Sequence, residues 1–238
     1  MRKRKERPAF QKVNRKKQGK NDQGRPYYEL SITYLDGANI FGPGGKDRAY
    51  EDIQRAAELW EVDFVIKEII DGSGRNNSFR LKPGFSKKDL VCGASFGRNQ
   101  ALLSLLKTLT HKGRSPNHII HIIYTGFASF ADGETAGCAF PLQMSRWGNS
   151  YHFILLTNSA GTASNRSLCA HELGHTFYRT ARFQRNIDPT TLIYPFRRPD
   201  VHSHLEDNVM YPVPGSNSSL LKSQKEKAWQ SSLLIKES

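Results

Sequence analysis

The stretch Ser167-Leu-Cys-Ala-His171-Glu172-Leu-Gly-His175-Thr-Phe-Tyr178 contains the pattern H-E-x-x-H. In an α-helix, positions i and i+4 lie on one face, so His171 and His175 can present their imidazoles to a single point. That point suits a zinc ion, which binds imidazole nitrogen at about 2.0–2.1 Å in a tetrahedral site. The stretch therefore predicts a metal-binding helix. The alternative is a surface helix that carries two histidines by chance.

The position of Glu172, directly after the first histidine, places its carboxylate beside a zinc-bound water rather than on the metal. Zinc lowers the pKa of such a water toward about 7. A carboxylate in that place can take the proton of the water as it attacks a carbonyl, and can then hand it to the leaving amine. We therefore predict zinc (Zn2+) as the cofactor and Glu172 as the general base.

A catalytic zinc needs a third protein ligand and keeps one position open. The metzincin pattern H-E-x-x-H-x-x-G-x-x-H does not continue in this chain, because Tyr178 and Ala181 stand where the glycine and the third histidine would be. The third ligand must therefore come from further along the sequence. The candidates are His202, His204, Glu206 and Asp207.

The segment His202-Ser-His-Leu-Glu-Asp-Asn-Val-Met210-Tyr-Pro resembles the end of a matrixin zinc site, where histidine-serine precedes a Met-turn that ends in Met-x-Pro. This resemblance to a metzincin family implies that His171, His175 and His202 bind zinc. It also implies that Met210 forms an apolar floor under the metal, with His204 as the alternative third ligand. The chain departs from the family in a long insertion, since 26 residues separate the second histidine from His202.

The fold implied by the resemblance is a zincin or metzincin-like catalytic domain of the α/β (α+β) class. It has a twisted mixed sheet, an active-site helix, a Met-turn and a C-terminal helix. The hydrophobic patterning agrees, and the initial order strand, helix, strand predicts a parallel pair. Ser164 and Asn165 are the expected N-caps of the active-site helix. The expected strands are residues 27–35, 62–70, 117–124 and 151–156, and the expected helices are residues 47–61, 99–111, 163–180 and 217–235.

Several segments are expected to surround the cleft. Residues 135–140 are predicted to form an edge strand that can pair antiparallel with a bound peptide. Residues 182–201 form an inserted loop that either walls the cleft, acts as a lid, or is a passive connection. The resemblance implies that residues 212–214 form the outer wall. Tyr178 and Tyr211 are candidate donors to a developing oxyanion.

Length and composition predict a basic disordered tail at residues 1–26 and one protease domain at residues 27–238. Residues 1–25 carry a net charge of +9 out of +13 in total, so the tail is either solubilising or a weak contact for an anionic partner. The sequence contains no apolar run long enough to predict a transmembrane helix. In a classical signal peptide an apolar segment follows the basic start, and this sequence has none there. We therefore expect a cytoplasmic location or export by a non-classical route.

The chain has three cysteines, an odd count at wide spacing that does not predict a disulfide framework. Cys169 is expected to be a small buried residue, and a bridge between Cys138 and Cys169 remains open. Two further histidines, His118 and His121, are predicted to be structural.

Together these features predict a zinc-dependent endopeptidase, or metalloendopeptidase, whose partner is a protein or peptide substrate in the cleft. Two alternatives stay open. One is a catalytically silent zinc-binding domain that recognises a partner, and the other is a zinc amidase that acts on cell-wall peptide.

Overall fold

A computed structural model of the chain describes residues 26–71, 86–92, 99–110, 116–143, 150–181, 186–193, 200–215 and 218–236. The predicted basic tail lies outside the described residues, except for its last residue. Within the described part of the chain, no helix is both long and apolar enough to cross a membrane.

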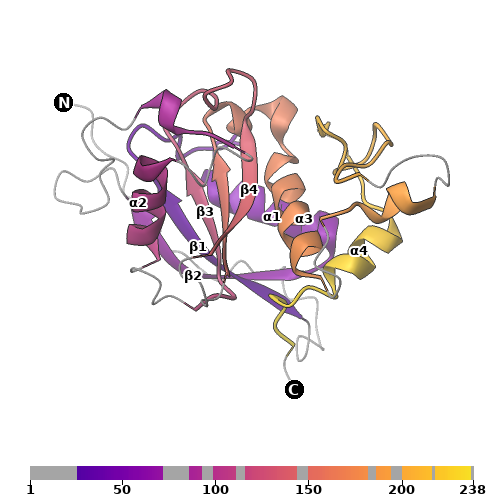
Figure 1. Ribbon diagram of the computed structural model, residues 1–238. Helices are drawn as coiled ribbons and strands as arrows, with labels where there is room; N and C mark the ends of the chain where they lie inside the picture. The colour runs from indigo at the N-terminus through magenta and orange to yellow at the C-terminus, as the bar shows by residue number, and fades with distance from the viewer. Residues whose placement is uncertain are drawn as a thin grey trace.

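The described chain forms a five-stranded mixed sheet with helices on both faces, which confirms the α/β class (Figure 1). Short 3₁₀ turns occur at Lys87–Asp89, Ser159–Gly161, Ala163–Asn165 and Pro189–Ile193. The strands are β1 (Tyr27–Tyr34), β2 (Asp63–Asp71), β3 (Ile120–Tyr124), β4 (Gly137–Gln143) and β5 (Ser150–Leu156), and the helices are α1 (Arg48–Trp60), α2 (Gln100–Leu109), α3 (Leu168–Thr180) and α4 (Lys222–Ala228).

The strand order is β2-β1-β3-β5-β4, and every neighbouring pair is parallel except β4 with β5. The predicted parallel pair of the first two strands is therefore confirmed, and so is the predicted edge strand. Pro141 lies within β4, which fits an edge position because proline has no backbone N–H for a second neighbour. Helices α1 and α3 lie on one face of the sheet and α2 lies on the other (Figure 1).

Helix ends follow the side-chain chemistry of the flanking residues. The carboxylate of Asp47 accepts a hydrogen bond from N of Tyr50 at the start of α1. Oδ1 of Asn99 accepts from N of Leu102 at 2.9 Å at the start of α2. Such caps satisfy backbone donors that have no partner inside the helix, so they define where these helices begin.

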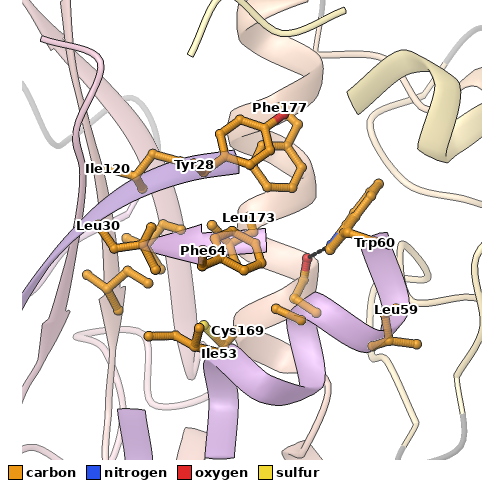
Figure 2. Packing of buried hydrophobic residues seen from close by; sticks show 14 of the residues in the cluster. Tyr28, Leu30, Ile53, Leu59, Trp60, Phe64, Ile120, Cys169, Leu173 and Phe177 are labelled. Atoms are coloured by element: carbon orange, nitrogen blue, oxygen red, sulfur yellow. Dashed lines mark hydrogen bonds between the residues drawn. The ribbon is translucent and has the colours of Figure 1, made fainter. Parts of the chain in front are cut away.

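Aromatic packing fixes α3 against the sheet and against α1 (Figure 2). The ring of Phe177 stacks on Tyr28 from β1 with centroids 4.3 Å apart, and it meets the edge of Trp60 from α1 at 5.2 Å. Nε1 of Trp60 donates to O of Ala170 at 2.9 Å. Because all these groups are buried, α3 is held in one position relative to the sheet.

Gly174 on α3 is required by close packing. A Cβ at this position would overlap Sδ of Met210 and would lie 2.7 Å from Cζ2 of Trp60. We expect Gly174→Ala to lower the free energy of unfolding by about 1–3 kcal/mol, because forced overpacking outweighs the gain of about 1 kcal/mol from the better helix propensity of alanine. Urea denaturation would measure this, with Gly215→Ala as the control, since a Cβ at that glycine would meet only Oγ of Ser218, at 3.8 Å. Equal losses in both variants would contradict the packing argument.

The active-site helix begins later than the sequence predicts. α3 starts after Ser167, and residues 163–165 form a separate 3₁₀ turn. The predicted N-caps are wrong because their side chains bond elsewhere. Nδ2 of Asn165 donates to O of Ser159 at 2.8 Å, and the hydroxyl of Ser164 pairs with that of a neighbouring threonine.

The C-terminal helix is also shorter than predicted, since α4 covers only part of residues 217–235. Beyond α4 the backbone pairs with other segments instead of continuing as a helix. N of Ser232 donates to O of Thr180 at 2.9 Å, and Ile235 exchanges two backbone hydrogen bonds with Tyr27. These contacts fasten the end of the described chain to α3 and β1.

Candidate metal centre

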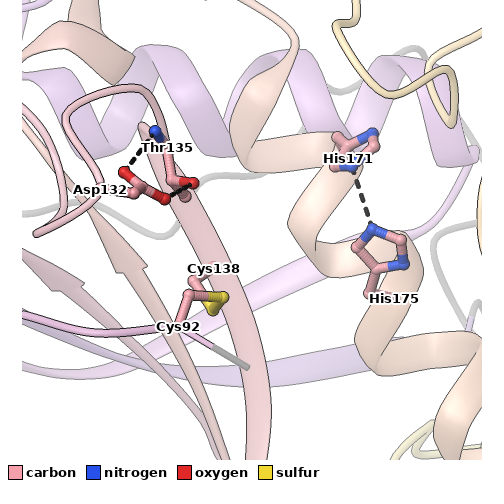
Figure 3. Close-up of a disulfide and its surroundings, with 6 residues drawn as sticks. All are labelled: Cys92, Asp132, Thr135, Cys138, His171 and His175. Atoms are coloured by element: carbon pink, nitrogen blue, oxygen red, sulfur yellow. Dashed lines mark hydrogen bonds between the residues drawn. A yellow bond between two sulfur atoms is a disulfide. The ribbon is translucent and has the colours of Figure 1, made fainter. Parts of the chain in front are cut away.

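Three histidines meet at one point on the surface of α3. His171 and His175 lie one turn apart on this helix, and His202 reaches them from the segment that precedes the Met-turn. One ring nitrogen from each lies within 4.8 Å of the other two. The ring of His202 stacks on that of His171 at 5.3 Å between centroids and lies 5.0 Å from that of His175. The two helix histidines are drawn in Figure 3.

Hydrogen bonds at the outer ring nitrogens define which nitrogens face the centre. Nδ1 of His171 donates to O of Val209 at 2.7 Å, because a carbonyl can only accept. Nδ1 of His175 lies 3.3 Å from Oδ1 of Asn186 and donates to it. Both Nε2 atoms are then acceptors, and they face each other at 3.0 Å. Two facing lone pairs repel, so the donor set fits a cation that both nitrogens share.

The electrostatics of the centre keep the imidazoles neutral. Burial lowers the pKa of His171 to about 4, although the hydrogen bond to Val209 opposes this. Burial also lowers the pKa of His175 well below its usual range, and the pKa of His202 is lowered for the same reason. Neutral imidazole is the form that binds metals, so the cluster can hold a metal ion.

A buried polar network holds the segment that carries the third histidine. N of Ser203 donates to O of Met210 at 2.8 Å, and N of Met210 donates to Oδ1 of Asn208 at 2.9 Å. The side chains of Asn208 and Gln224 exchange two hydrogen bonds, and Nε2 of Gln224 also donates to the buried carboxylate of Asp188 at 2.7 Å. The network therefore joins the Met-turn to α4 and to the inserted segment.

The other candidates for a third ligand lie outside the cluster. His204, Glu206 and Asp207 do not belong to the group of three histidines, and the two acids are exposed. The side chain of Met210 is fully buried and lies against α3 at Gly174. The predicted floor residue thus packs beneath the histidine helix.

Glu172 points from α3 toward the edge strand. A Cβ at Gly137 of β4 would lie 2.9 Å from Oε1 of Glu172, so only a glycine leaves room for this carboxylate. Burial raises the pKa of Glu172 to about 8, while a hydrogen bond from the backbone of Ala139 and the charge of Arg179 act in the opposite direction. The carboxylate is therefore held next to the histidines with a pKa near neutrality.

A cleft of about 960 Å³ opens over these side chains. The edge strand β4 lines it, and residues 212–214 line it as the resemblance implies. Asn186 and Val201 from the inserted segment also line the cleft, so the insertion contributes to its wall. The described lining residues are Cys92, Glu134, Thr135, Ala136, Gly137, Cys138, Ala139, Phe140, Pro141, Leu142, Asn165, Leu168, His171, Glu172, His175, Arg179, Asn186, Val201, His202, Pro212, Val213 and Pro214.

The two tyrosines considered as oxyanion donors are not among the described lining residues. Tyr178 is wrong as a candidate because its ring is buried in the core, edge-on to Trp60 at 5.9 Å. Tyr211 is likewise outside the cleft lining. The histidines expected to be structural also lie outside the described cleft lining. Nε2 of the half-buried His118 lies 2.9 Å from Oε2 of the buried Glu29, and His121 is buried against the ring of Phe153 at 5.2 Å.

A disulfide joins Cys92 to Cys138 beside the cleft (Figure 3). The cysteine count and spacing did not indicate this bridge, and the bridge considered between Cys138 and Cys169 is wrong. The physical reason is that Cys138 packs in the core on the α2 face of the sheet, whereas Cys169 is a buried free thiol in the core on the opposite face.

We expect the double variant Cys92→Ser/Cys138→Ala to lower the free energy of unfolding by about 3–4 kcal/mol, because the bridge closes a loop of 46 residues in the unfolded chain. Urea denaturation measures the loss. Reductant should lower the wild-type midpoint and leave that of the variant unchanged. A wild-type midpoint that does not respond to reductant would contradict the prediction, as would three titratable thiols in the unreduced, unfolded chain.

Two residues of this site were not predicted from the sequence. Asn186 orients His175 from within the insertion, where no periodic pattern exists to indicate it. Arg179 lies four residues after His175 and seven after Glu172, so helical periodicity alone could have placed it on the cleft side of α3.

Comparisons with known proteins find similar chains among solved structures. No family model and no curated protein matches this chain. Among solved structures, the chain is similar to the crystal structure of metalloproteinase-II from Bacteroides fragilis, with 15% sequence identity and a TM-score of 0.48. The match covers 86% of this chain and 53% of the other, so the chain spans about half the length of that protein.

Proposed function

We propose that this protein is a zinc-dependent endopeptidase of divergent, matrixin-like metzincin type, with a long insertion between its second and third ligands. One observation carries the proposal: three neutral imidazoles and a buried carboxylate converge in one cleft beside β4, the edge strand of the sheet among the described residues. In the H-E-x-x-H order, the two histidines can bind a metal and the glutamate can act as a base. A metal site that only stabilises the fold does not need the glutamate.

His171, His175 and His202 would hold the zinc. Bound there, zinc would polarise the scissile carbonyl and lower the pKa of a water molecule toward about 7. Val209 and Asn186 support the role of the two helix histidines, because they fix the tautomers that leave Nε2 ready to bind a metal.

Glu172 would act as the general base. It takes a proton from the attacking water and returns it to the leaving amine. The raised pKa, about 8, supports this role, since a group whose pKa lies near the working pH can both accept and give a proton. Its place opposite Gly137 supports it too, because the carboxylate lies next to the strand that would hold the substrate.

The substrate would bind as an extra strand on β4. Among the described strands β4 pairs only with β5, so its other edge can accept the backbone of an extended peptide. Such a peptide would run antiparallel to β4, with residues 212–214 on its other side. This mode of binding suits an endopeptidase, because backbone pairing extends on both sides of the cleaved bond.

The disulfide is relevant to the cellular location of the protein. Disulfides persist in oxidising compartments and are rare in the reducing cytoplasm. The bond between Cys92 and Cys138 therefore supports export over a cytoplasmic location.

Metal analysis combined with a cleavage assay tests the proposed function. Purified protein should contain about one zinc per chain, and a chelator should abolish cleavage of a mixed peptide library until zinc is restored. Cleavage by metal-free protein would overturn the proposal. Zinc-loaded protein that cleaves a peptidoglycan digest but no peptide would be an amidase. Zinc-loaded protein that cleaves neither would be a silent binding domain.

A further inference from the structure

Arg179 places a guanidinium in the cleft, where its charge acts on the carboxylate of Glu172. Arg179 lies in the last turn of α3, one turn beyond His175 on the same face, and is partly buried. Its guanidinium takes part in none of the ion pairs among the described residues. Partly burying a charge that forms no ion pair costs free energy, and a ligand carboxylate in contact with the guanidinium would offset that cost.

Charge is distributed unevenly along the cleft. Among the described lining residues, Arg179 is the only lysine or arginine, and the carboxylates are Glu134 and Glu172. Glu172 is the proposed base and Glu134 is exposed. Glu134 precedes Gly137, the residue that faces Glu172, so it lies toward the N-terminal end of β4.

Arg179 lies toward the other end of the same strand, because it is two helical turns beyond Glu172 on α3, which packs along β4 and runs in the same direction (Figure 3). Burial, and to a smaller extent the charge of Arg179, lower the pKa of the buried His152 to about 4. His152 on β5 is the register partner of Pro141 on β4. The cleft therefore has a carboxylate near the start of β4, the proposed base opposite Gly137, and a guanidinium near Pro141.

The direction of β4 decides which part of a substrate meets this guanidinium. A peptide that pairs antiparallel with β4 has its N-terminal half beside the C-terminal half of the strand. Arg179 would then contact residues that precede the scissile bond. Arginine is suited to this contact because its planar guanidinium binds a carboxylate through two parallel hydrogen bonds.

We propose that Arg179 is a specificity-determining residue that binds an acidic side chain of the substrate, at one of the few positions before the cleaved bond. The inference rests on the proposed function and narrows its substrate class to peptides that are acidic on this side. Because guanidinium carries its charge at any working pH, the preference should depend on salt rather than on the protonation of the enzyme.

Internally quenched peptides test the proposal. Three series would carry Glu, Gln or Lys at the first, second or third position before a common cleaved bond, with the rest of the peptide unchanged. At one position, the wild-type kcat/KM should be about ten- to a hundredfold higher for Glu than for Gln, as expected for a charge-assisted hydrogen bond. The Lys peptide should be the poorest of the three, and added salt should reduce the differences.

Variants then assign the preference to this residue. Arg179→Gln should bring the Glu-to-Gln ratio to about one, and Arg179→Glu should favour the Lys peptide. Arg179→Lys should keep part of the preference, because it keeps the charge. Lys107→Gln removes one positive charge from the exposed side of α2, on the opposite face of the sheet, and should leave the ratio unchanged. Since each ratio is internal to one protein sample, partial misfolding does not alter it.

The failures of the two proposals are distinguishable. Equal cleavage of the Glu and Gln peptides by wild-type protein would overturn the role of Arg179 and leave the peptidase intact. A Glu preference that persists in Arg179→Gln would overturn it as well. If the zinc-loaded protein cleaves no peptide, the proposed peptidase fails. Fluorescence anisotropy with the same peptides then decides whether Arg179 binds the acidic side chain, and equal affinities for the Glu and Gln peptides would reject that too.

Discussion

Glu172→Gln should lower kcat/KM for peptide cleavage by about 10²- to 10⁴-fold while the zinc content stays at the wild-type level. The amide keeps the size and shape of the side chain at this buried position, so the packing of α3 should not change. What the variant loses is the ability to accept a proton from water and return it to the amine. Metal analysis and peptide kinetics on the same sample measure both halves of this expectation.

A second carboxylate in the same cleft gives the matched control. Glu134 also lines the cleft, but it is exposed, lies before Gly137 and does not belong to the group that could hold a metal ion. Glu134→Gln should therefore change kcat/KM far less than the same substitution at Glu172. If both variants lose activity equally, or if Glu172→Gln remains active with zinc bound, Glu172 is not the base. If zinc is lost together with activity, the carboxylate contributes to holding the metal.

Much of the fold could be predicted because most elements bury one face. The periodic apolar residues of residues 47–61 and 99–111 predicted α1 and α2 to within two residues. The ends of α3 and α4 could not be predicted in this way, since they depend on contacts with distant segments. Asn165 bonds to the turn before α3, and Ile235 pairs with Tyr27 from the start of the described chain.

The same distinction between local and long-range contacts applies to the candidate site. His171, Glu172 and His175 lie within two helical turns, so local geometry was enough to bring them together. The disulfide depended on which face of the sheet each cysteine occupies, and the sequence around Cys138 does not reveal that. Asn186 lies in an insertion without periodicity, and its contact with His175 exists only in the folded chain.

His202→Ala should remove most of the zinc, whereas His204→Ala should leave the zinc content unchanged. The reason is geometric: His202 contributes a ring nitrogen to the cluster within 4.8 Å, and His204 does not belong to that cluster. His202 was predicted as a ligand only because its segment resembles that of a family in which the spacing between the second and third histidines is much shorter. The conformation of the insertion, held by the network of Asp188 and Gln224, is what delivers the ring.

A graded series of zinc affinities gives this prediction its sharpest form. Asn186→Ala removes only the side chain that orients His175, and should weaken zinc binding by about 10–100-fold, as for other partners of metal-binding histidines. His202→Ala removes a ligand and should weaken it further. Competition with a chromophoric chelator measures the zinc affinity of these two variants and of His204→Ala on one scale. A stronger loss in His204→Ala than in His202→Ala would move the third ligand to His204, and it would mean that the segment before the Met-turn adopts a different register once zinc is bound.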